Sequence, residues 1–265
     1  MILYIYMQTQ TYLHDCITKG KLSRWHEKVM PLSVYIGKFN WYKSKGVSDE
    51  IKYTKMITDA FNIWERLSGG IVSFKRAANI YDSNINVEWK RVERKSLGSC
   101  TFNYDKLGRY YSAEVSIGLS DGIIHHKYMD ENEVFHTILH EIGHSVGLGH
   151  SKTRGDIMYV PHEYGVVNVS HNDIATLRWL YKMPVGKSEK EILAMYPQQK
   201  AKNLDDLVKI LSGEKSDFEK TKDALIAQQS QKDLLQENEN IGDLKKYQLQ
   251  LNNLDIKIDK SKFRN

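Results

Sequence analysis

Apolar and polar residues follow two different periods along the first 183 residues of the chain. Two short stretches, 32–36 and 112–119, alternate apolar and polar residues, which is typical of strands with one buried face. Two more apolar stretches, 71–74 and 85–89, are also predicted to be strands. From Ser48 onward, apolar residues recur at spacings of three, four and six, which predicts an amphipathic helix. The predicted buried face of this helix comprises Ile51, Ile57, Ala60, Phe61, Trp64 and Leu67.

Two further helices carry start signals. Asp130 followed by Glu133, and Ser170 followed by Asp173, resemble capping boxes, in which two side chains satisfy backbone N–H groups at a helix start. Apolar side chains would pack the first of these helices against the sheet; they are Val134, Ile138, Leu139 and Ile142. The chain is therefore expected to contain both a sheet and helices.

The composition changes after residue 183. Only four aromatic residues follow this point, so the packed domain is expected to end near Pro184. The remainder is polar and predicted to be helical, with one amphipathic stripe in 204–211 and a heptad-like stripe in 244–258. These helices are expected to pack loosely on the domain or to bind a helical partner, the alternative being partial disorder. The predicted division is an N-terminal segment 1–23, a catalytic domain 24–183 and a helical extension 184–265.

Charge and hydropathy exclude several classes of protein. The formal net charge is +5, but no basic cluster stands out, so no nucleic-acid partner is expected. No window of about 18 apolar residues suggests a membrane helix. The apolar stretch 1–7 is too short for the hydrophobic core of a signal peptide and has no positive residue before it.

The stretch from His140 to Met158 carries the candidate chemistry. It reads His-Glu-Ile-Gly-His-Ser-Val-Gly-Leu-Gly-His, followed by seven residues and then Met158. On a helix with about 100° and 1.5 Å per residue, His140 and His144 lie about 40° apart and one turn apart, so both imidazoles can reach one ion. Glu141 would lie beside that ion, where a carboxylate can accept a proton from a zinc-bound water.

A third histidine can join this site only if the helix ends before it. On a continuous helix, His150 would lie about 9 Å beyond His144 and on another face. Gly147 is where the chain can turn, because glycine adopts the left-handed conformation without a Cβ penalty. Three neutral imidazoles would leave a fourth position open for water, whose pKa zinc lowers to about 7. The spacing thus predicts one catalytic zinc ion bound by His140, His144 and His150.

The same stretch resembles the matrixin branch of the metzincin zinc peptidases. The pattern H-E-x-x-H-x-x-G-x-x-H with a downstream methionine is typical of metzincins. Ser151 after the third histidine and the turn Asp156-Ile157-Met158-Tyr159 are similar to matrixins in particular. The similarity extends to residues 24–25, 31–36, 60–65 and 169–181.

This resemblance implies an α+β fold, with a twisted mixed sheet and three main helices, to which the helical extension is attached. It implies that His140, His144 and His150 bind zinc, that Glu141 is the base, and that Met158 is the Met-turn residue beneath the metal. It also implies that the strand at 112–119 is the edge strand along which an extended peptide binds by strand addition. The alternative is an outer strand with no partner.

The chain departs from the usual matrixin pattern after Met158. Matrixins commonly continue Met-Tyr-Pro-x-Tyr, whereas Pro161 and Tyr164 are displaced here. Both are candidates for the wall of the pocket that receives the side chain after the scissile bond, so substrate preference stays open. No calcium site or second zinc site is expected, although His125, His126 and Asp130 lie nearby in the sequence. His136 is expected on the solvated helix surface, with a role supporting the metal site as the alternative.

The two cysteines leave several alternatives. Animal matrixins are held latent by a propeptide cysteine that binds zinc, and Cys16 lies upstream of the motif without the surrounding family sequence. Cys16 is therefore a candidate latency thiol, the alternative being an ordinary surface or buried thiol. Cys100 is expected to be buried structure, and the sequence leaves a Cys16–Cys100 disulfide open.

We interpret the chain as a zinc-dependent endopeptidase that hydrolyses peptide bonds of extended protein substrates. One alternative is a non-catalytic protein that keeps the zinc fold and binds through its helical tail. Another is an enzyme blocked by its own residues 1–23. The resemblance favours a secreted or cell-surface location over a cytoplasmic one, and the sequence does not indicate the natural substrate.

Overall fold

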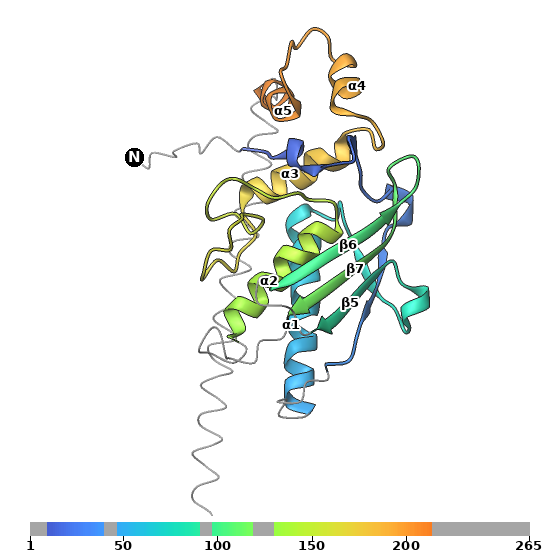
Figure 1. The fold of residues 1–265 in the computed structure, drawn as a ribbon, viewed down its shortest axis with the longest axis vertical. Helices are drawn as coiled ribbons and strands as arrows, with labels where there is room; N and C mark the ends of the chain where they lie inside the picture. The colour runs from blue at the N-terminus through green and yellow to red at the C-terminus, as the bar shows by residue number, and fades with distance from the viewer. Residues whose placement is uncertain (1–9, 40–46, 91–96, 119–129, 214–265) are drawn as a thin grey trace, which may run out of the picture. The chain divides into compact units, whose positions relative to one another are not determined.

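A five-stranded mixed sheet forms one layer of the fold (Figure 1). Its order is β4-β3-β5-β7-β6, and its strands are β3 (Leu32–Ile36), β4 (Phe74–Arg76), β5 (Ile85–Lys90), β6 (Gly98–Tyr104) and β7 (Tyr110–Gly118). The pairs β3–β4, β3–β5 and β5–β7 are parallel, and β6–β7 is antiparallel. These and all later statements concern residues 10–39, 47–90, 97–118 and 130–213, which the computed structural model describes.

The predicted strands are mostly confirmed. β3 and β5 lie where their apolar patterns placed them, because Leu32, Val34, Ile85 and Val87 turn their side chains into the core. β4 overlaps the predicted stretch 71–74 only at its first residue, Phe74.

The prediction that the strand at 112–119 forms the sheet edge is wrong. β7 covers most of this stretch, and it lies between β5 and β6. β6, which the sequence did not predict, is the edge strand on this side of the sheet, and β4 is at the other edge. The tight turn between β6 and β7 is held by Asp105 Oδ1, which accepts from the N–H groups of Leu107 (2.8 Å) and Arg109 (3.0 Å). This hairpin places β6 on the otherwise open side of β7.

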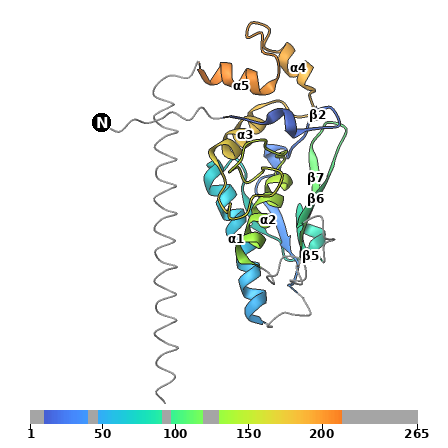
Figure 2. The same ribbon diagram turned by 60° about the vertical axis from the view of Figure 1, so that its left-hand side comes forward.

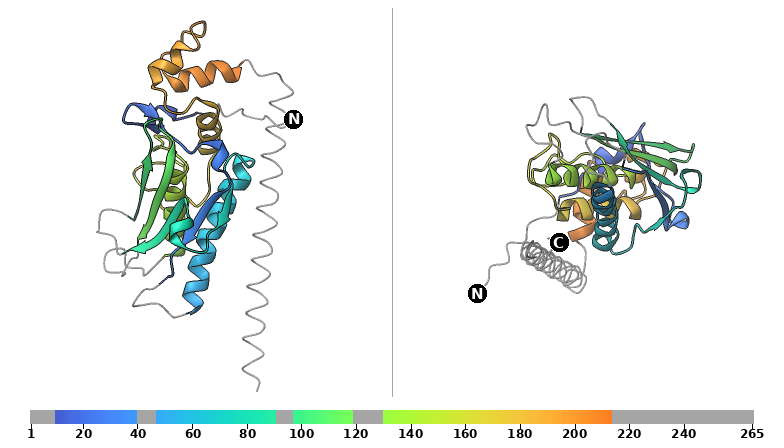
Figure 3. Two further views of the ribbon diagram at one scale, coloured as in Figure 1. Left: turned by 90° about the vertical axis from the view of Figure 1, so that its right-hand side faces the viewer. Right: turned by 90° about the horizontal axis from the view of Figure 1, so that it is seen from below.

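Helices α1 (Val47–Ser68) and α2 (Glu131–Ser145) cover one face of the sheet (Figures 2 and 3). The apolar spacing predicted for α1 is confirmed at its centre, where Ile57 and Trp64 are fully buried. Trp64 Nε1 donates to the carbonyl oxygen of Leu139 at 3.0 Å and so joins α1 to α2. Ile51 was predicted to be buried but is 63% exposed, because the buried face of this part of α1 carries Asp49 and Tyr53 instead.

The two predicted helix starts differ in detail. Ser170 and Asp173 form the full capping box of α3 (His171–Lys182), which confirms that prediction. At the start of α2, Asp130 accepts from the N–H groups of Asn132 and Glu133, but the Glu133 carboxylate contacts His162 instead of completing a box. The start of α2 was thus predicted correctly, but the hydrogen bond from the Asp130 N–H to the Glu133 side chain that would complete a capping box was not.

Segments at both ends of the described chain join the same core. Toward the N-terminus lie η1 (Leu13–Cys16), β1 (Ile17–Thr18), β2 (Lys21–Leu22) and η2 (Glu27–Val29), while η3 (Ile80–Asp82) lies between β4 and β5. Beyond α3 lie α4 (Glu189–Ala194) and α5 (Leu204–Gly213), the latter matching the predicted stripe 204–211. Leu13, Leu22, Ile192 and Leu204 are fully buried in one cluster with the sheet and helices. Packing therefore continues past Pro184 as far as α5.

The predicted stripe 244–258 lies outside the described residues. Within the described part of the chain, no helix has the length and apolar character needed to cross a membrane.

Arg24 and Trp25 connect the N-terminal segment to the ends of two helices. Trp25 is fully buried, and its Nε1 donates to the carbonyl oxygen of Ser145 at the end of α2 (2.7 Å). Arg24 is also buried and donates to the carbonyl oxygens of Tyr181 in the last turn of α3 (3.2 Å) and of Met183 just after it (3.0 Å). Since the last carbonyls of a helix have no partner within the helix, these contacts satisfy them and fix both helix ends.

Candidate active site

Three histidines converge at the end of α2. His140 and His144 lie one turn apart in the helix, and His150 comes from the loop that follows. The helix ends at Ser145 and Gly147 has a φ of 106°, so the predicted turn at this glycine is confirmed. The Nε2 atoms of His140 and His144 are 3.1 Å apart, and those of His144 and His150 are also 3.1 Å apart.

Backbone carbonyls orient two of these imidazoles. His140 Nδ1 lies 2.8 Å from the carbonyl oxygen of Ile157, and His144 Nδ1 lies 2.8 Å from that of Leu148. Since a carbonyl oxygen only accepts, each Nδ1 carries the proton and each Nε2 is free to bind a metal. Two tetrahedral zinc ligands with bonds of about 2.0–2.1 Å would lie about 3.3 Å apart. The observed separations therefore fit zinc.

Burial keeps the imidazoles neutral. It lowers the pKa of His140 to about 4 and that of His144 to about 3, and partial burial of the more exposed His150 ring also lowers its pKa. Neighbouring imidazoles add to the effect on His140 and His144, because two positive charges so close together repel. A neutral imidazole is the form that binds a metal ion, so all three are ready to do so at neutral pH.

Glu141 is buried beside this cluster. Burial raises the pKa of its carboxyl group to about 7, and its Oε2 has no hydrogen-bond partner. The first residue of β6 lies directly against it, since a Cβ at Gly98 would be 2.8 Å from Glu141 Oε1. A buried carboxylate oxygen without a partner is costly unless a bound group completes the site. This orphaned oxygen is a second sign that the site is built for a metal and its water.

The chain segment around Met158 packs beneath α2. Met158 is fully buried, and a Cβ at Gly143 would lie 2.4 Å from its sulfur atom, so only glycine leaves room for it. The N–H of Ser151 donates to the carbonyl oxygen of Met158 at 2.8 Å. The segment that follows the third histidine is thus joined directly to the methionine turn.

Asp173 supports this turn in a way that the sequence did not indicate. Its Oδ2 accepts from the N–H of Ile157 (2.9 Å), and its Oδ1 accepts from the hydroxyl of Tyr12 (2.7 Å). Ile157 is the residue whose carbonyl orients His140. The capping-box pattern identified Asp173 as a helix cap, but no local signal connects it to Tyr12, which is 161 residues away.

The loop after Met158 contacts the first half of α2. His162 Nε2 lies 2.5 Å from Glu133 Oε2, and the hydroxyl of Tyr164 donates to Asp130 Oδ2 at 3.3 Å. Tyr164 is 65% exposed. Pro161 directly precedes His162 in this loop, so both candidate pocket residues lie on the segment that these contacts hold.

The expectation that His136 lies on the solvated helix surface is wrong. Its side chain is buried, because its Nδ1 donates to the carbonyl oxygen of Val166 (2.6 Å) and its ring contacts that of His162. Burial lowers the pKa of His136 to about 4. The loop folds back over α2 and covers this face, which periodicity along the helix could not reveal.

Both cysteines carry free thiols, so they form no disulfide with each other. Cys16 is buried, and its Sγ accepts from the N–H of Gly149 at 3.2 Å. Burial raises the pKa of Cys16 to about 12, so the thiol is protonated at neutral pH, whereas a zinc ligand must be a thiolate. Burial and the nearby Glu141 also raise the pKa of Cys100. The latency role of Cys16 stays a prediction.

No second metal site was expected from His125, His126 and Asp130, and of these only Asp130 lies within the described residues. His125 and His126 lie outside them, and Asp130 caps α2.

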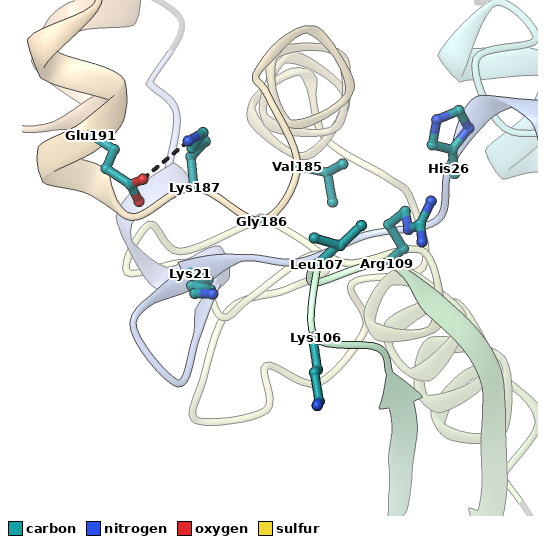
Figure 4. A pocket seen from close by; sticks show the side chains of 9 residues that line it. All are labelled: Lys21, His26, Lys106, Leu107, Arg109, Val185, Gly186, Lys187 and Glu191. Atoms are coloured by element: carbon teal, nitrogen blue, oxygen red, sulfur yellow. Dashed lines mark hydrogen bonds and ion pairs between the residues drawn. The ribbon is translucent and has the colours of Figure 1, made fainter.

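Figure 4 shows a separate hollow lined by residues of β2, the β6–β7 turn and the segment before α4. Lys187 forms an ion pair with Glu191 there at 3.1 Å. The hollow shares no residue with the histidine cluster and takes no part in the metal site.

The comparison with protein families supports the same conclusion as the geometry. The sequence model of the Matrixin family matches residues 38–182, which is more than half of the chain, and all three histidines lie within the match. The chain therefore belongs to the matrixin family. It is a zinc-dependent endopeptidase that acts on protein substrates, and its catalytic zinc is held by His140, His144 and His150. No curated protein matches the chain.

Proposed function

We propose that Glu141 is the general base of this endopeptidase. The observation that carries the proposal is the buried Oε2 atom without a hydrogen-bond partner, on a carboxyl group whose pKa is raised to about 7. A base with a pKa near the working pH combines a useful fraction of carboxylate with a strong drive to accept a proton. Helix geometry supports its place, since Glu141 lies about 60° around α2 from His144.

The residues of the site divide the reaction between them. A zinc ion held by His140, His144 and His150 would supply a Lewis acid for the scissile carbonyl and would lower the pKa of water at the site to about 7. Glu141 accepts a proton from the attacking water and delivers it to the leaving amine. The carbonyls of Ile157 and Leu148 keep two imidazoles in the tautomer that presents Nε2. Met158 fills the space beneath α2 without serving as a ligand.

We propose that an extended substrate binds along β6. This strand is at the edge of the sheet, and its first residue, Gly98, packs against Glu141. A peptide that pairs with the edge through main-chain hydrogen bonds would therefore place its backbone beside the base. Pro161 and Tyr164, on the loop after Met158, would line the pocket for the side chain that follows the scissile bond.

Replacing Glu141 by glutamine tests its role. The amide keeps the shape of the side chain but cannot accept the proton, so kcat should fall about 100- to 10,000-fold. The zinc content of the purified full chain, measured by atomic emission, should remain one ion per chain. Glu131→Gln, at the exposed start of the same helix, is the matched control and should cleave casein at the wild-type rate. A Glu141→Gln protein that cleaves casein as fast as the wild type would exclude the proposed base.

We further propose that residues 24–183 form the catalytic domain and that the protein acts outside the cytoplasm. The family match at 38–182 and the end of α3 at Lys182 support the C-terminal limit, while η1, α4 and α5 pack onto this domain from outside it. Matrixins are typically secreted, which supports the location. Fractionation of the source cells with an antibody against the chain would test it, since a purely cytoplasmic signal would contradict secretion. Binding of residues 184–265 to a helical partner stays a prediction, and its part beyond residue 213 is outside the described residues.

A further inference from the structure

The short turn η1 is held from outside by a residue of α5. Asp205 Oδ1 accepts from the N–H of Leu13 (2.7 Å) and from the hydroxyl of Thr11 (2.8 Å), and its Oδ2 accepts from the N–H of His14 (3.2 Å). These N–H groups begin a helical turn and have no partner within it, so a carboxylate is the natural acceptor. One side chain near the end of the described chain thus fixes a turn near its beginning. The helix that carries it, α5, lies beside the N-terminal segment (Figure 1).

The other side of the same turn presses on the residue before the third zinc ligand. A Cβ at Gly149 would lie 1.9 Å from the carbonyl oxygen of Asp15, so the turn and Gly149 meet backbone to backbone. The N–H of Gly149 donates to Cys16 Sγ at 3.2 Å. Lys152, two residues after His150, pairs with Asp15 Oδ2 at 3.3 Å. Contacts from η1 therefore flank the ligand on both sides.

His150 depends on such support more than the other two ligands. His140 and His144 belong to α2, whose hydrogen bonds fix their spacing, whereas His150 lies in a loop and its side chain is exposed. The backbone of 148–150 also supplies the Leu148 carbonyl that orients His144. Movement of this short segment would therefore disturb two of the three ligands together.

We propose that Asp205, acting through η1, is a positioning residue for the third zinc ligand. Asp205 holds the turn, the turn holds Gly149, and Gly149 sets the place of His150. Neither Asp205 nor η1 lies within the region 38–182 that matches the Matrixin family, so α5 completes the zinc site from outside the matched domain. The inference rests on the zinc site and not on the role of Glu141.

Asp205→Asn in the full chain is the first test. An amide offers fewer acceptor positions and brings two donors of its own, so it cannot replace the three bonds of the carboxylate. Competition with a chromophoric chelator should show zinc bound about 10-fold more weakly, which is the lower end of the effect of losing a group that orients a metal ligand. The visible absorption of the cobalt-substituted protein should also change, because it reports ligand geometry.

Asp206→Asn is the matched control. It makes the same charge change at the next position of α5, but Asp206 Oδ2 accepts from the N–H of Lys202 (2.9 Å) in its own segment. This variant should keep the wild-type zinc affinity within about two-fold and the wild-type cobalt spectrum. Glu141→Gln should likewise retain zinc, so failure of the base proposal and failure of this one give different results.

Cys16 variants keep the proposal falsifiable if Asp205→Asn does not fold. Cys16→Ala removes the acceptor for the Gly149 N–H and should weaken zinc binding, whereas Cys16→Ser keeps an acceptor and should restore most of the affinity. Unchanged zinc affinity and cobalt spectrum in folded Asp205→Asn or in Cys16→Ala would overturn the proposal. Equal losses in Asp205→Asn and Asp206→Asn would also overturn it. So would higher activity of Cys16→Ala at unchanged zinc affinity, which is the result expected of a latency thiol.

Discussion

Two consecutive loops connect the end of α2 to α3, and they are held in different ways. The first loop, 146–158, is fixed mainly by its backbone. Its Leu148 N–H donates to the carbonyl oxygen of Gly143 (3.0 Å), and its Ile157 N–H donates to the buried Asp173 (2.9 Å). Met158 at its end is fully buried. This loop carries His150 and both carbonyls that orient the other ligands.

The second loop, 159–169, is held largely by side chains near the surface. The His162–Glu133 pair is partly exposed, and the Tyr164 hydroxyl contacts Asp130 at the exposed start of α2. A buried contact, from His136 to the carbonyl oxygen of Val166, supports its far end. Buried hydrogen bonds are costly to break, while partly exposed side-chain pairs contribute little to stability. We therefore expect the contacts around the zinc ligands to be harder to break than those of the candidate pocket wall.

The largest expected effect in this comparison is on the free energy of unfolding, and it concerns His136, the buried residue that contacts the second loop. His136 stays neutral in the folded protein down to a pKa of about 4, whereas an unfolded histidine accepts a proton near pH 6.5. Its contribution to the free energy of unfolding is therefore complete above pH 6.5 and is lost as the pH falls toward 4. The free energy of unfolding should fall by at most about 2–3 kcal/mol for this reason.

Urea unfolding of the zinc-loaded wild type and of His136→Gln, at several pH values, measures this loss. Glutamine does not titrate, so the difference between the two proteins should shrink by that amount from pH 7 to pH 4. Because the zinc ligands are present in both proteins, their own titration cancels. A difference that stays constant over this range would show that His136 is not a buried neutral group.

A smaller effect is expected in the first loop from Gly143→Ala. The new methyl group would overlap the sulfur atom of Met158, which is buried and has little room to move. Overpacking should outweigh the gain in helix propensity, leaving a net loss of about 1–2 kcal/mol in the free energy of unfolding. Zinc affinity should fall as well, because Ile157 next to Met158 orients His140.

Gly213→Ala is the control for this substitution, since a Cβ at Gly213 meets nothing within 4 Å. It should leave zinc affinity unchanged and should not lower the free energy of unfolding, since no overpacking opposes the gain in helix propensity. If Gly143→Ala were as stable as the wild type and bound zinc equally well, the close packing of Met158 beneath α2 would not constrain the site.

The smallest effect is expected from Glu133→Gln. This change weakens the contact with His162 and should cost about 0.5–1 kcal/mol, since the pair is partly exposed. The loss should appear as a two- to five-fold rise in KM with kcat nearly unchanged, because the second loop is proposed to line the substrate pocket and not to take part in proton transfer. A peptide library should show an altered preference after the scissile bond. Glu131→Gln, whose carboxylate pairs with Lys52 instead, should change neither KM nor the profile.

Much of the site could be predicted from the sequence, because its information is local. The spacing of His140 and His144 defines one face of a helix, and Gly147 marks where that helix must end. Ser170 and Asp173 define the start of α3 in the same way. Each of these features depends on residues within a few positions of one another, so helix geometry alone connects the sequence to the structure.

The remaining features were decided by contacts between distant parts of the chain. An alternating pattern identifies a strand but not its neighbours, so it could not show that β6, and not β7, is the edge. His136 is buried because a loop 30 residues away returns to cover it. Asp205 reaches the zinc site only through η1, which is more than 190 residues distant in the sequence. The sequence by itself determined the zinc ligands and the adjacent glutamate, whereas the tertiary structure decided which groups hold them, because packing across the core leaves no periodic signal along the chain.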